Sequence, residues 1–251
     1  MARRVPVYGL DIETDTTVDG LDPGVARVLT VALSCPHHDE VFSGAEPRLL
    51  RELDERLAQL PAGVVATWNG AAFDLPFLAD RAQLHGLSLG LRLVADPGIN
   101  LRHSPLPGHA GAYRGAWHDH HHLDAYRLYR NDVGPTLRVS CSLKSIARLV
   151  GLAAVEVDRD QIHDLSHEVL HAYASSDARL ARVLTERRWP AAVRAVDKLP
   201  PEPDRDAERS AQPAVASGGP MLIPLSVRTK VHPADRASRQ PERQPEVAAR
   251  A

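Results

Sequence analysis

Short apolar segments of two kinds alternate between Val5 and Arg187, and this alternation constrains the fold more than any other feature. Segments rich in β-branched and apolar residues predict strands, whereas leucines at helical spacing predict an amphipathic helix over residues 49–60. The predicted strands are Val5–Glu13, Val25–Cys35, His38–Phe42, Val64–Trp68 and His118–Asp124, and the further predicted helices are Leu75–Leu84, Leu143–Val150 and Ser166–Arg187. We expect the glycine- and proline-rich stretch Gly90–Gly115 to be irregular. Strands that first follow one another and then alternate with helices indicate an α/β fold, with helices on the faces of a mixed sheet.

The composition changes sharply near Leu199. From Pro200 to the end, the chain is dense in Pro, Ser, Gln and mixed charge, and it cannot bury enough apolar surface to fold. We therefore expect a folded domain over residues 1–199 and a disordered C-terminal tail over residues 200–251. One apolar run, Met221–Leu225, interrupts this tail. It is either a chance cluster or a short peptide that docks onto a protein partner or onto the protein's own surface.

The overall composition narrows the class of protein. Apolar residues make up 43% and charged residues 25%, as in soluble globular proteins. No apolar run is long enough for a membrane span, and Arg3 and Arg4 lead directly into a strand pattern, so we expect a cytoplasmic protein with no membrane contact. Cys35 and Cys141 lack zinc-site spacing. The net charge of −2 argues against a protein that coats duplex DNA, but leaves room for a metal-bearing acidic cleft.

Two carboxylates, Asp11 and Glu13, interrupt the first apolar strand. Because side chains alternate along a strand, both lie on one face, and Leu10 and Ile12 lie on the other. Neighbouring carboxylates in apolar surroundings repel one another, so a divalent metal is an economical partner for them. The alternative is a strand end whose acids are simply solvated.

Two more clusters carry possible chemistry. Asn69–Pro76 follows a predicted buried strand and places Asp74 near the start of a helix, where it is either a functional acid or a helix cap. Tyr173 and Asp177 are four residues apart in the last long helix, so both side chains lie on one helix face. Taken alone, this spacing is typical of a surface pair.

Together, in order, Asp-x-Glu, Asn-x-x-x-Phe-Asp and Tyr-x-x-x-Asp resemble the three exonuclease motifs of the DEDD superfamily, and the tyrosine resembles its tyrosine-type branch. Thr67–Leu78 is similar to the second motif of the proofreading 3′–5′ exonuclease domain of family B DNA polymerases. Leu123–Tyr126 and Cys141–Ala147 resemble stretches between the second and third motifs. The resemblance covers residues 5–187 and extends to stand-alone bacterial ribonuclease H-like exonucleases.

This resemblance implies a ribonuclease H-like fold with a mixed five-stranded sheet, and a two-metal 3′–5′ exonuclease that releases 5′-nucleoside monophosphates from single-stranded ends. Two Mg²⁺ or Mn²⁺ ions would be held by four carboxylates, with Asp11 bridging both ions. The residues that the resemblance implicates are Asp11, Glu13, Asp74 and Asp177 as metal ligands, Tyr173 as the group that orients water, and Asn69, Thr14 and Phe73 at the substrate.

The chain departs from the polymerases, because nothing in 251 residues supplies their palm and fingers. We therefore expect no polymerisation, and the choice between DNA and RNA 3′ ends stays open. A second hypothesis is a nucleic-acid-binding module that keeps the fold without turnover.

A third hypothesis is a metal phosphohydrolase built on the run His118–His122. On a strand, His118, His120 and His122 would share one face, and three imidazoles suit zinc. The alternatives are a solvated strand edge near the cleft, or histidines that contact substrate phosphates. Asp124 directly follows this run and is a secondary candidate for the catalytic cluster.

Overall fold

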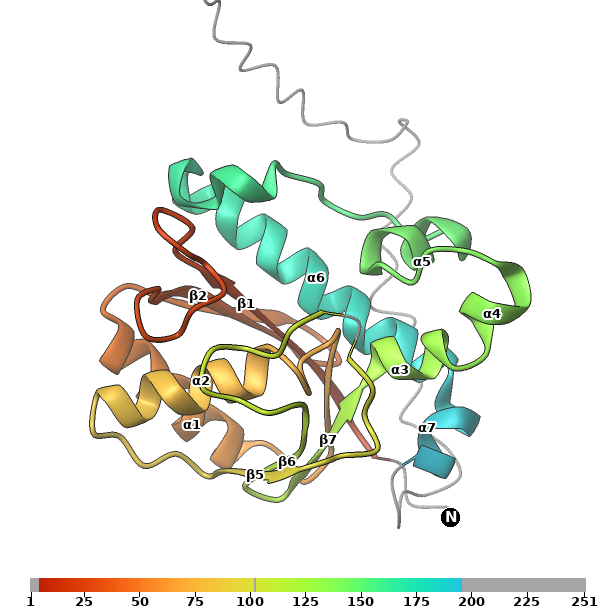
Figure 1. Cartoon of the computed structure of the whole chain (residues 1–251), viewed down its shortest axis with the longest axis horizontal. Coiled ribbons are helices and arrows are strands. Elements are labelled where there is room, and N and C mark those ends of the chain that lie inside the picture. Colours follow the sequence, from red (N-terminus) through yellow and green to blue (C-terminus); the bar gives the residue numbers. More distant parts are fainter. Residues whose placement is uncertain (1–4, 102, 196–251) are drawn as a thin grey trace, which may run out of the picture. The chain divides into compact units, whose positions relative to one another are not determined.

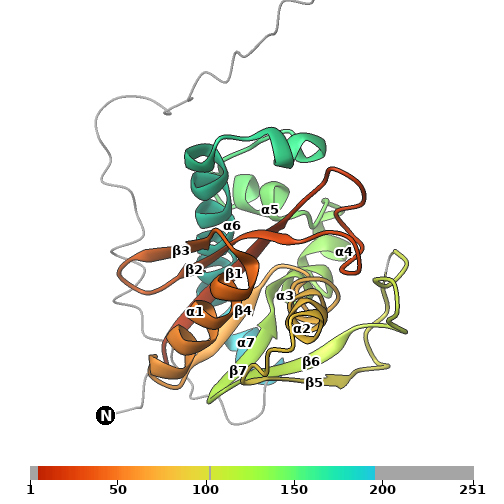
Figure 2. The same ribbon diagram turned by 90° about the vertical axis from the view of Figure 1, so that its left-hand side faces the viewer.

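The structure is a computed structural model that describes residues 5–101 and 103–195. These residues form a sheet with helices packed on both of its faces (Figures 1 and 2). The strands are β1 (Val7–Thr14), β2 (Val28–Ser34), β3 (Asp39–Ser43), β4 (Val64–Thr67), β5 (Leu91–Ala95), β6 (Tyr113–Trp117) and β7 (His120–Asp124). The helices are α1 (Glu46–Gln59), α2 (Asp74–Leu84), α3 (Ala125–Arg130), α4 (Val133–Leu137), α5 (Leu143–Leu149), the 3₁₀ helix η1 (Arg159–Asp164), α6 (His167–Arg187) and α7 (Trp189–Ala195).

The sheet has seven strands in the order β3-β2-β1-β4-β7-β6-β5. β1, β4 and β7 run parallel to one another, whereas β2 and β3 are joined to β1 by antiparallel pairs. This arrangement confirms the predicted α/β class, a ribonuclease H-like mixed sheet flanked by helices. The predicted number of five strands was wrong, because β6 and β5 extend the sheet beyond β7.

Of the two additional strands, β5 lies inside the stretch Gly90–Gly115 that was expected to be irregular, and β6 begins inside it and ends at Trp117. They pair antiparallel, with Leu91 opposite Trp117 and Ala95 opposite Tyr113. The glycines and prolines belong mainly to the long connection between these strands. Because each arm is only five residues long and the partners are distant in sequence, local pattern alone did not indicate the pair.

Other elements also escaped prediction. The helices α3, α4 and α7 and the 3₁₀ helix η1 are short, and none carries a long periodic pattern. The predicted tail, residues 200–251, and its apolar run Met221–Leu225 lie outside the described residues. A search of the described part of the chain finds no helix whose length and apolar character would let it cross a membrane.

Alternate residues of β1 face opposite helical layers. Leu10 and Ile12 belong to the core that includes residues of α1 and α2. On the other face, α6 lies very close to β1, because a Cβ atom at Gly9 would be only 1.8 Å from the carbonyl oxygen of Ala178. Only glycine allows this approach without a shift of the helix, and the approach brings the side chains of α6 to the polar face of β1.

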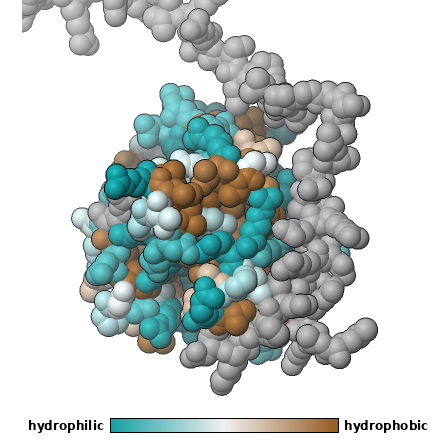
Figure 3. Space-filling view, turned by 90° about the vertical axis from the view of Figure 1, so that its right-hand side faces the viewer, coloured by the Kyte–Doolittle hydropathy of each residue, from teal (hydrophilic) through white to brown (hydrophobic). Residues whose placement is uncertain are grey.

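A second core lies beneath α5, α6 and α7. Ile146 and Ala147 of α5 are fully buried in it together with Leu184 of α6. The outer side of this region stays apolar, and Figure 3 shows apolar side chains gathered on the side of the molecule that includes α4 and α5. The exposed leucines of these two helices are Leu137, which is 54% exposed, and Leu149, which is 47% exposed.

Candidate active site

Three carboxylates from two distant parts of the chain meet at one point. Asp11 and Glu13 lie on one face of β1 and are half-buried, as the two-residue period of a strand predicts. Asp177 comes from α6 and is buried. One oxygen of each carboxylate lies within 4.8 Å of the others. The close approach of α6 at Gly9 therefore assembles an acidic cluster from sequence positions more than 160 residues apart.

The fourth predicted acid, Asp74, lies beside this cluster. It is the first residue of α2 and is only 4% exposed. Phe73, not Asp74, is the N-cap residue of α2, so the helix-cap alternative does not describe its position. The charge of Asp74 raises the pKa of Asp11, so Asp74 lies close to the acids at the carboxyl end of β1.

Burial and mutual repulsion disturb the titration of the whole cluster. Burial, followed by the charges of Glu13 and Asp177, raises the pKa of Asp11 well above its usual range. Burial also raises the pKa of Glu13 to about 8 and that of Asp74 to about 7, and it raises the pKa of Asp177 against the opposing charge of Lys144. Without added cations, Glu13 therefore stays largely protonated at neutral pH and Asp74 is partly protonated.

The donor set fits a divalent metal ion. Asp11 Oδ2 is buried and has no hydrogen-bond partner among the described residues, which is costly for a carboxylate oxygen. Mg²⁺ and Mn²⁺ prefer oxygen ligands, and a cation here would relieve both the missing contact and the repulsion. The residues suited to hold such ions are Asp11, Glu13 and Asp177, with Asp74 beside them.

Tyr173 lies one helical turn before Asp177 on α6 and is 3% exposed. This spacing brings its hydroxyl beside the Asp177 carboxylate. Burial, together with the charges of Asp177 and Glu13, raises the pKa of the phenol above its usual value. The phenol therefore stays protonated at neutral pH and acts as a hydrogen-bond donor, not as a base.

Two cations at this site were not singled out from the sequence. Lys144, on α5, donates a hydrogen bond to Asp177 Oδ1, and its Nζ lies 4.5 Å from the centroid of the Tyr173 ring. Arg159, at the start of η1, lowers the pKa of Glu13, Asp74 and Asp177. The only indication of Lys144 in the sequence was that it stands in the stretch Cys141–Ala147, which is similar to exonuclease domains. No sequence pattern indicated Arg159.

The residues predicted at the substrate have different surroundings. Asn69 is exposed in the loop after β4 and has a left-handed backbone with φ 72°, which asparagine tolerates. Phe73 packs against Phe77, with their ring centroids 5.4 Å apart. Thr14 is buried, and its hydroxyl donates to the carbonyl oxygen of Gly20 over 2.7 Å, so it shapes the loop that follows β1.

Asp124 holds the loop that carries Asn69. Its Oδ1 accepts hydrogen bonds from the backbone N–H of Asn69 at 2.8 Å and from that of Tyr126 at 3.2 Å, which makes it the N-cap of α3. Burial raises its pKa to about 6, and its charge contributes to the raised pKa of Asp74. Asp124 is therefore a structural neighbour of the acidic cluster and not a member of the three-carboxylate group.

The histidine run is built into the fold. His120 accepts a hydrogen bond from the backbone of Gly63 and donates one to the carbonyl oxygen of Leu57. His122 pairs with the hydroxyl of Thr67, and burial lowers its pKa to about 3. β7 lies between β4 and β6, so the run is not a solvated sheet edge.

His118 has a positive φ of 49° just before β7 and hydrogen-bonds Asp54, so it does not extend the strand face. Within the described residues, no group of three potential ligands includes a histidine of this run. The geometry thus gives no support to a zinc centre built on these histidines.

Another possible ligand group lies at the turn between β2 and β3. One ligand atom each of Cys35, His38 and Glu40 lies within 4.8 Å of the others. The guanidinium of Arg56, however, already donates to both carboxylate oxygens of Glu40, and burial raises the pKa of the Cys35 thiol to about 12. A cation beside Glu40 and a thiol that resists ionisation both disfavour metal binding there.

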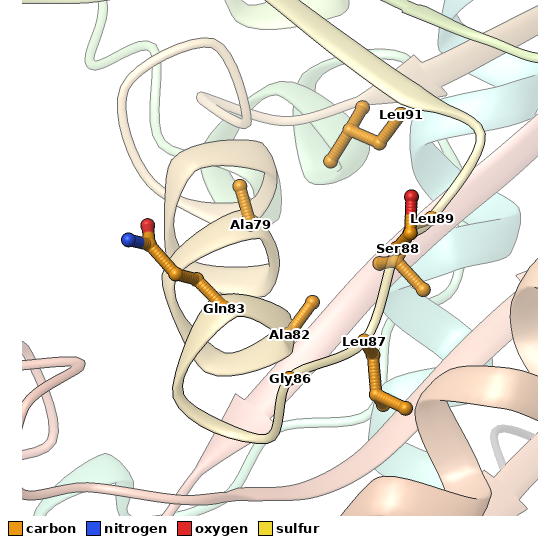
Figure 4. Close-up of a pocket in the computed structure, with 8 residues that line it drawn as sticks. All are labelled: Ala79, Ala82, Gln83, Gly86, Leu87, Ser88, Leu89 and Leu91. Atoms are coloured by element: carbon orange, nitrogen blue, oxygen red, sulfur yellow. The ribbon is translucent and has the colours of Figure 1, made fainter.

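A shallow hollow of about 360 Å³ opens at the opposite end of α2 from Asp74 (Figure 4). Its lining residues are Ala79, Ala82, Gln83, Gly86, Leu87, Ser88, Leu89 and Leu91. None of these side chains is titratable, and α2 rises about 15 Å between its first and last residues. The hollow is therefore separate from the acidic cluster.

No family model matches the chain. The fold is similar to the structure of the family B DNA polymerase from the hyperthermophilic archaeon Pyrobaculum calidifontis, with a TM-score of 0.61 and 21% sequence identity. The similarity covers 82% of this chain and 27% of the polymerase chain, so this chain spans about a quarter of that protein. At this level of identity, the comparison establishes that the chain shares the fold of one part of a family B DNA polymerase.

Proposed function

We propose that this protein is a tyrosine-type DEDD 3′–5′ exonuclease that hydrolyses single-stranded nucleic acid ends with two divalent metal ions. The observation that carries the proposal is the meeting of Asp11, Glu13 and Asp177, with Asp74 beside them, in a buried cluster. The motif order in the sequence and the fold shared with a family B DNA polymerase support it. A binding module without turnover would not need to retain a repulsive cluster with an unpartnered carboxylate oxygen.

The carboxylates divide the work of holding the ions. Asp11, Glu13 and Asp177 would hold the ions, and Asp74 would contribute a further carboxylate from the start of α2. When bound, Mg²⁺ or Mn²⁺ lowers the pKa of the attacking water and offsets the charge that develops on the phosphate. Four carboxylates and two divalent ions also balance in charge, which removes the repulsion that raises the pKa values of the acids.

In the proposed reaction, water adds to the phosphorus of the terminal phosphodiester, and the bond from phosphorus to the 3′ oxygen breaks. The terminal residue leaves as a 5′-nucleoside monophosphate, and the shortened strand keeps a 3′-hydroxyl. Tyr173 stays protonated and orients the water by hydrogen bonding beside Asp177. Asn69 and Phe73, on the loop before α2, are the proposed contacts for the terminal nucleotides, and Thr14 supports the facing loop.

The proposal is tested by incubating the full chain with single-stranded DNA and RNA oligonucleotides labelled at either end, with Mg²⁺, Mn²⁺ or EDTA. We expect stepwise shortening from the 3′ end with either metal and none in EDTA. Asp11→Ala and Asp177→Ala should abolish it and keep the fold. Cleavage that persists in EDTA or in both variants would refute the assignment, and the preferred sugar follows from the same assay.

A further inference from the structure

The first turns of α6 carry two histidines on one face of the helix. α6 begins at His167, and the side chain of Ser166 caps it by accepting a hydrogen bond from the backbone N–H of Val169 at 3.3 Å. Residues four apart in a helix are neighbours on its surface. The rings of His167 and His171 accordingly lie beside one another in a T-shaped arrangement, with their centroids 6.0 Å apart.

His171 has a ring nitrogen that the protein leaves unused. Its Nε2 is buried and has no hydrogen-bond partner among the described residues, which is costly for a polar atom. Burial, followed by the charge of His167, lowers the pKa of His171, so its imidazole is neutral at neutral pH. A neutral imidazole keeps one nitrogen lone pair, which is the form of histidine that binds a metal ion.

The geometry of the pair suits a shared ion. Each Zn–N bond is about 2.0–2.1 Å long, so two imidazoles on one ion must be close neighbours, as these rings are. His167 is exposed and His171 is half-buried. Because the last torsion of a histidine side chain is soft, rotation of the two rings can bring one nitrogen of each to the same ion.

The ligand type indicates which ion would bind. Imidazole nitrogens suit borderline transition-metal ions such as Zn²⁺, whereas Mg²⁺ prefers oxygen ligands. Over residues 5–101 and 103–195, no group of three potential ligands includes either histidine, so water would complete the coordination of the ion. A catalytic zinc centre uses three protein ligands, and we therefore expect a binding site and not a hydrolytic centre.

This site would be distinct from the acidic cluster, although both involve α6. His171 precedes Tyr173 by two residues, which turns the two side chains about 200° apart around the helix axis. Asp177 lies a further turn along the helix. An ion held by the histidine pair would therefore not contact the acids, but it would cross-link the first two turns of the helix that carries Tyr173 and Asp177.

We infer that His167 and His171 form a zinc-binding site, which holds Zn²⁺ through one nitrogen of each ring and fixes the start of α6. The inference does not depend on the proposed function, because it uses neither the acidic cluster nor a nucleic acid.

The test is calorimetric titration of the full chain with Zn²⁺ in excess Mg²⁺, which occupies oxygen-rich sites and competes poorly for imidazole. The wild type should bind Zn²⁺. His167→Ala should weaken the Zn²⁺ affinity at least about tenfold, because one of the two protein ligands is lost. In EDTA, the Tm of His167→Ala should equal that of the wild type, because the side chain of His167 is exposed.

A shifted variant tests the geometry of the pair. His171→Ala combined with Ala172→His keeps two histidines but moves one of them about 100° around the helix, at an exposed position. It should bind Zn²⁺ as weakly as His167→Ala. His103→Ala, which removes an exposed histidine between β5 and β6, is the control and should bind like the wild type.

Two outcomes would overturn the inference. One is an absence of Zn²⁺ binding by the wild type in excess Mg²⁺. The other is an equal Zn²⁺ affinity in the wild type, His167→Ala and the shifted variant, which would place the bound ion at other residues.

Discussion

Lys144 Nζ contacts Asp177 Oδ1, so an ammonium group reaches one of the three carboxylates that meet at the end of β1. The two side chains are 18% and 9% exposed, and the same ammonium lies over the ring of Tyr173. α5 therefore supplies one positive charge to a cluster that carries four carboxylates. This contact offsets part of the repulsion when no metal is bound.

Replacing Lys144 with methionine should destabilise the metal-free protein by about 2 kcal/mol, because Asp177 loses its partner in a buried cluster. Mn²⁺ should restore most of the loss, so the rise in Tm on adding Mn²⁺ should be larger in Lys144→Met than in the wild type. Arg148→Ala, at an exposed position one turn later on α5, is the control and should change neither value. Equal melting of Lys144→Met and wild type in EDTA would contradict the role assigned to this contact.

Gly9 of β1 should be highly sensitive to substitution. A methyl group there would lie 1.8 Å from the carbonyl oxygen of Ala178 and would push α6 away from the sheet. We expect Gly9→Ala to destabilise the protein by about 3 kcal/mol or more and to separate Asp177 from Asp11, so metal binding should be lost as well. Gly111→Ala is the control, because nothing lies within 4 Å of its added methyl group. Chemical denaturation of both variants checks the prediction.

The stability of the metal-free protein should fall as the pH rises. The pKa of Glu13 is raised to about 8 and that of Asp74 to about 7, so between about pH 4 and pH 8 the folded protein keeps protons that the unfolded chain has released. A rise of one pKa unit corresponds to about 1.4 kcal/mol, or about 3–6 °C in Tm for a domain of this size.

Thermal melting in EDTA at several pH values tests this expectation. The Tm of the wild type should fall from acidic to neutral pH. Glu13→Gln should show a flatter dependence of Tm on pH, because it removes one of the carboxyl groups with a raised pKa. Saturating Mg²⁺ or Mn²⁺ should stabilise most at the upper end of the range, where the carboxylates are ionised. A wild-type Tm that rises steadily through this range in EDTA would show that the pKa values of these acids are not raised in the folded protein.

Tyr173→Phe removes one hydroxyl and keeps the ring that packs on Ile162 and Leu170. If the hydroxyl orients water, single-turnover cleavage should slow by roughly one to three orders of magnitude, the range for losing one oriented group. Metal affinity should barely change, so the loss should appear in kcat and not in metal titrations. Asp177→Asn should lose both catalytic activity and metal affinity. A wild-type rate in Tyr173→Phe would make this tyrosine a packing residue.

The parts of the site that sequence could predict are those set by short-range geometry. The two-residue period placed Asp11 and Glu13 on one face of β1, and the four-residue helical spacing placed Tyr173 and Asp177 together on α6. Their meeting across the molecule depends on Gly9, whose role is visible only once α6 is packed on the sheet.

The missed features depend on tertiary contacts. Lys144 lies on an ordinary amphipathic helix, and only the packing of α5 beside α6 brings its ammonium to Asp177. Arg159 is in a 3₁₀ helix without apolar periodicity, held by Ile162. The role of the histidine run also depends on tertiary contacts. Three imidazoles in a short segment left zinc open as an alternative, whereas the structure shows hydrogen bonds such as that of His120 to Leu57.

Direct titration with Mn²⁺, followed by electron paramagnetic resonance, tests the claim that this cluster is a metal-dependent catalytic centre. The wild type should bind Mn²⁺, and Asp11→Asn and Asp177→Asn should each bind at least about tenfold more weakly, since each removes a charged ligand at the shared point. Glu52→Gln, at an exposed position on α1, should bind like the wild type. Equal Mn²⁺ affinity in the wild type and in both cluster variants would contradict the account.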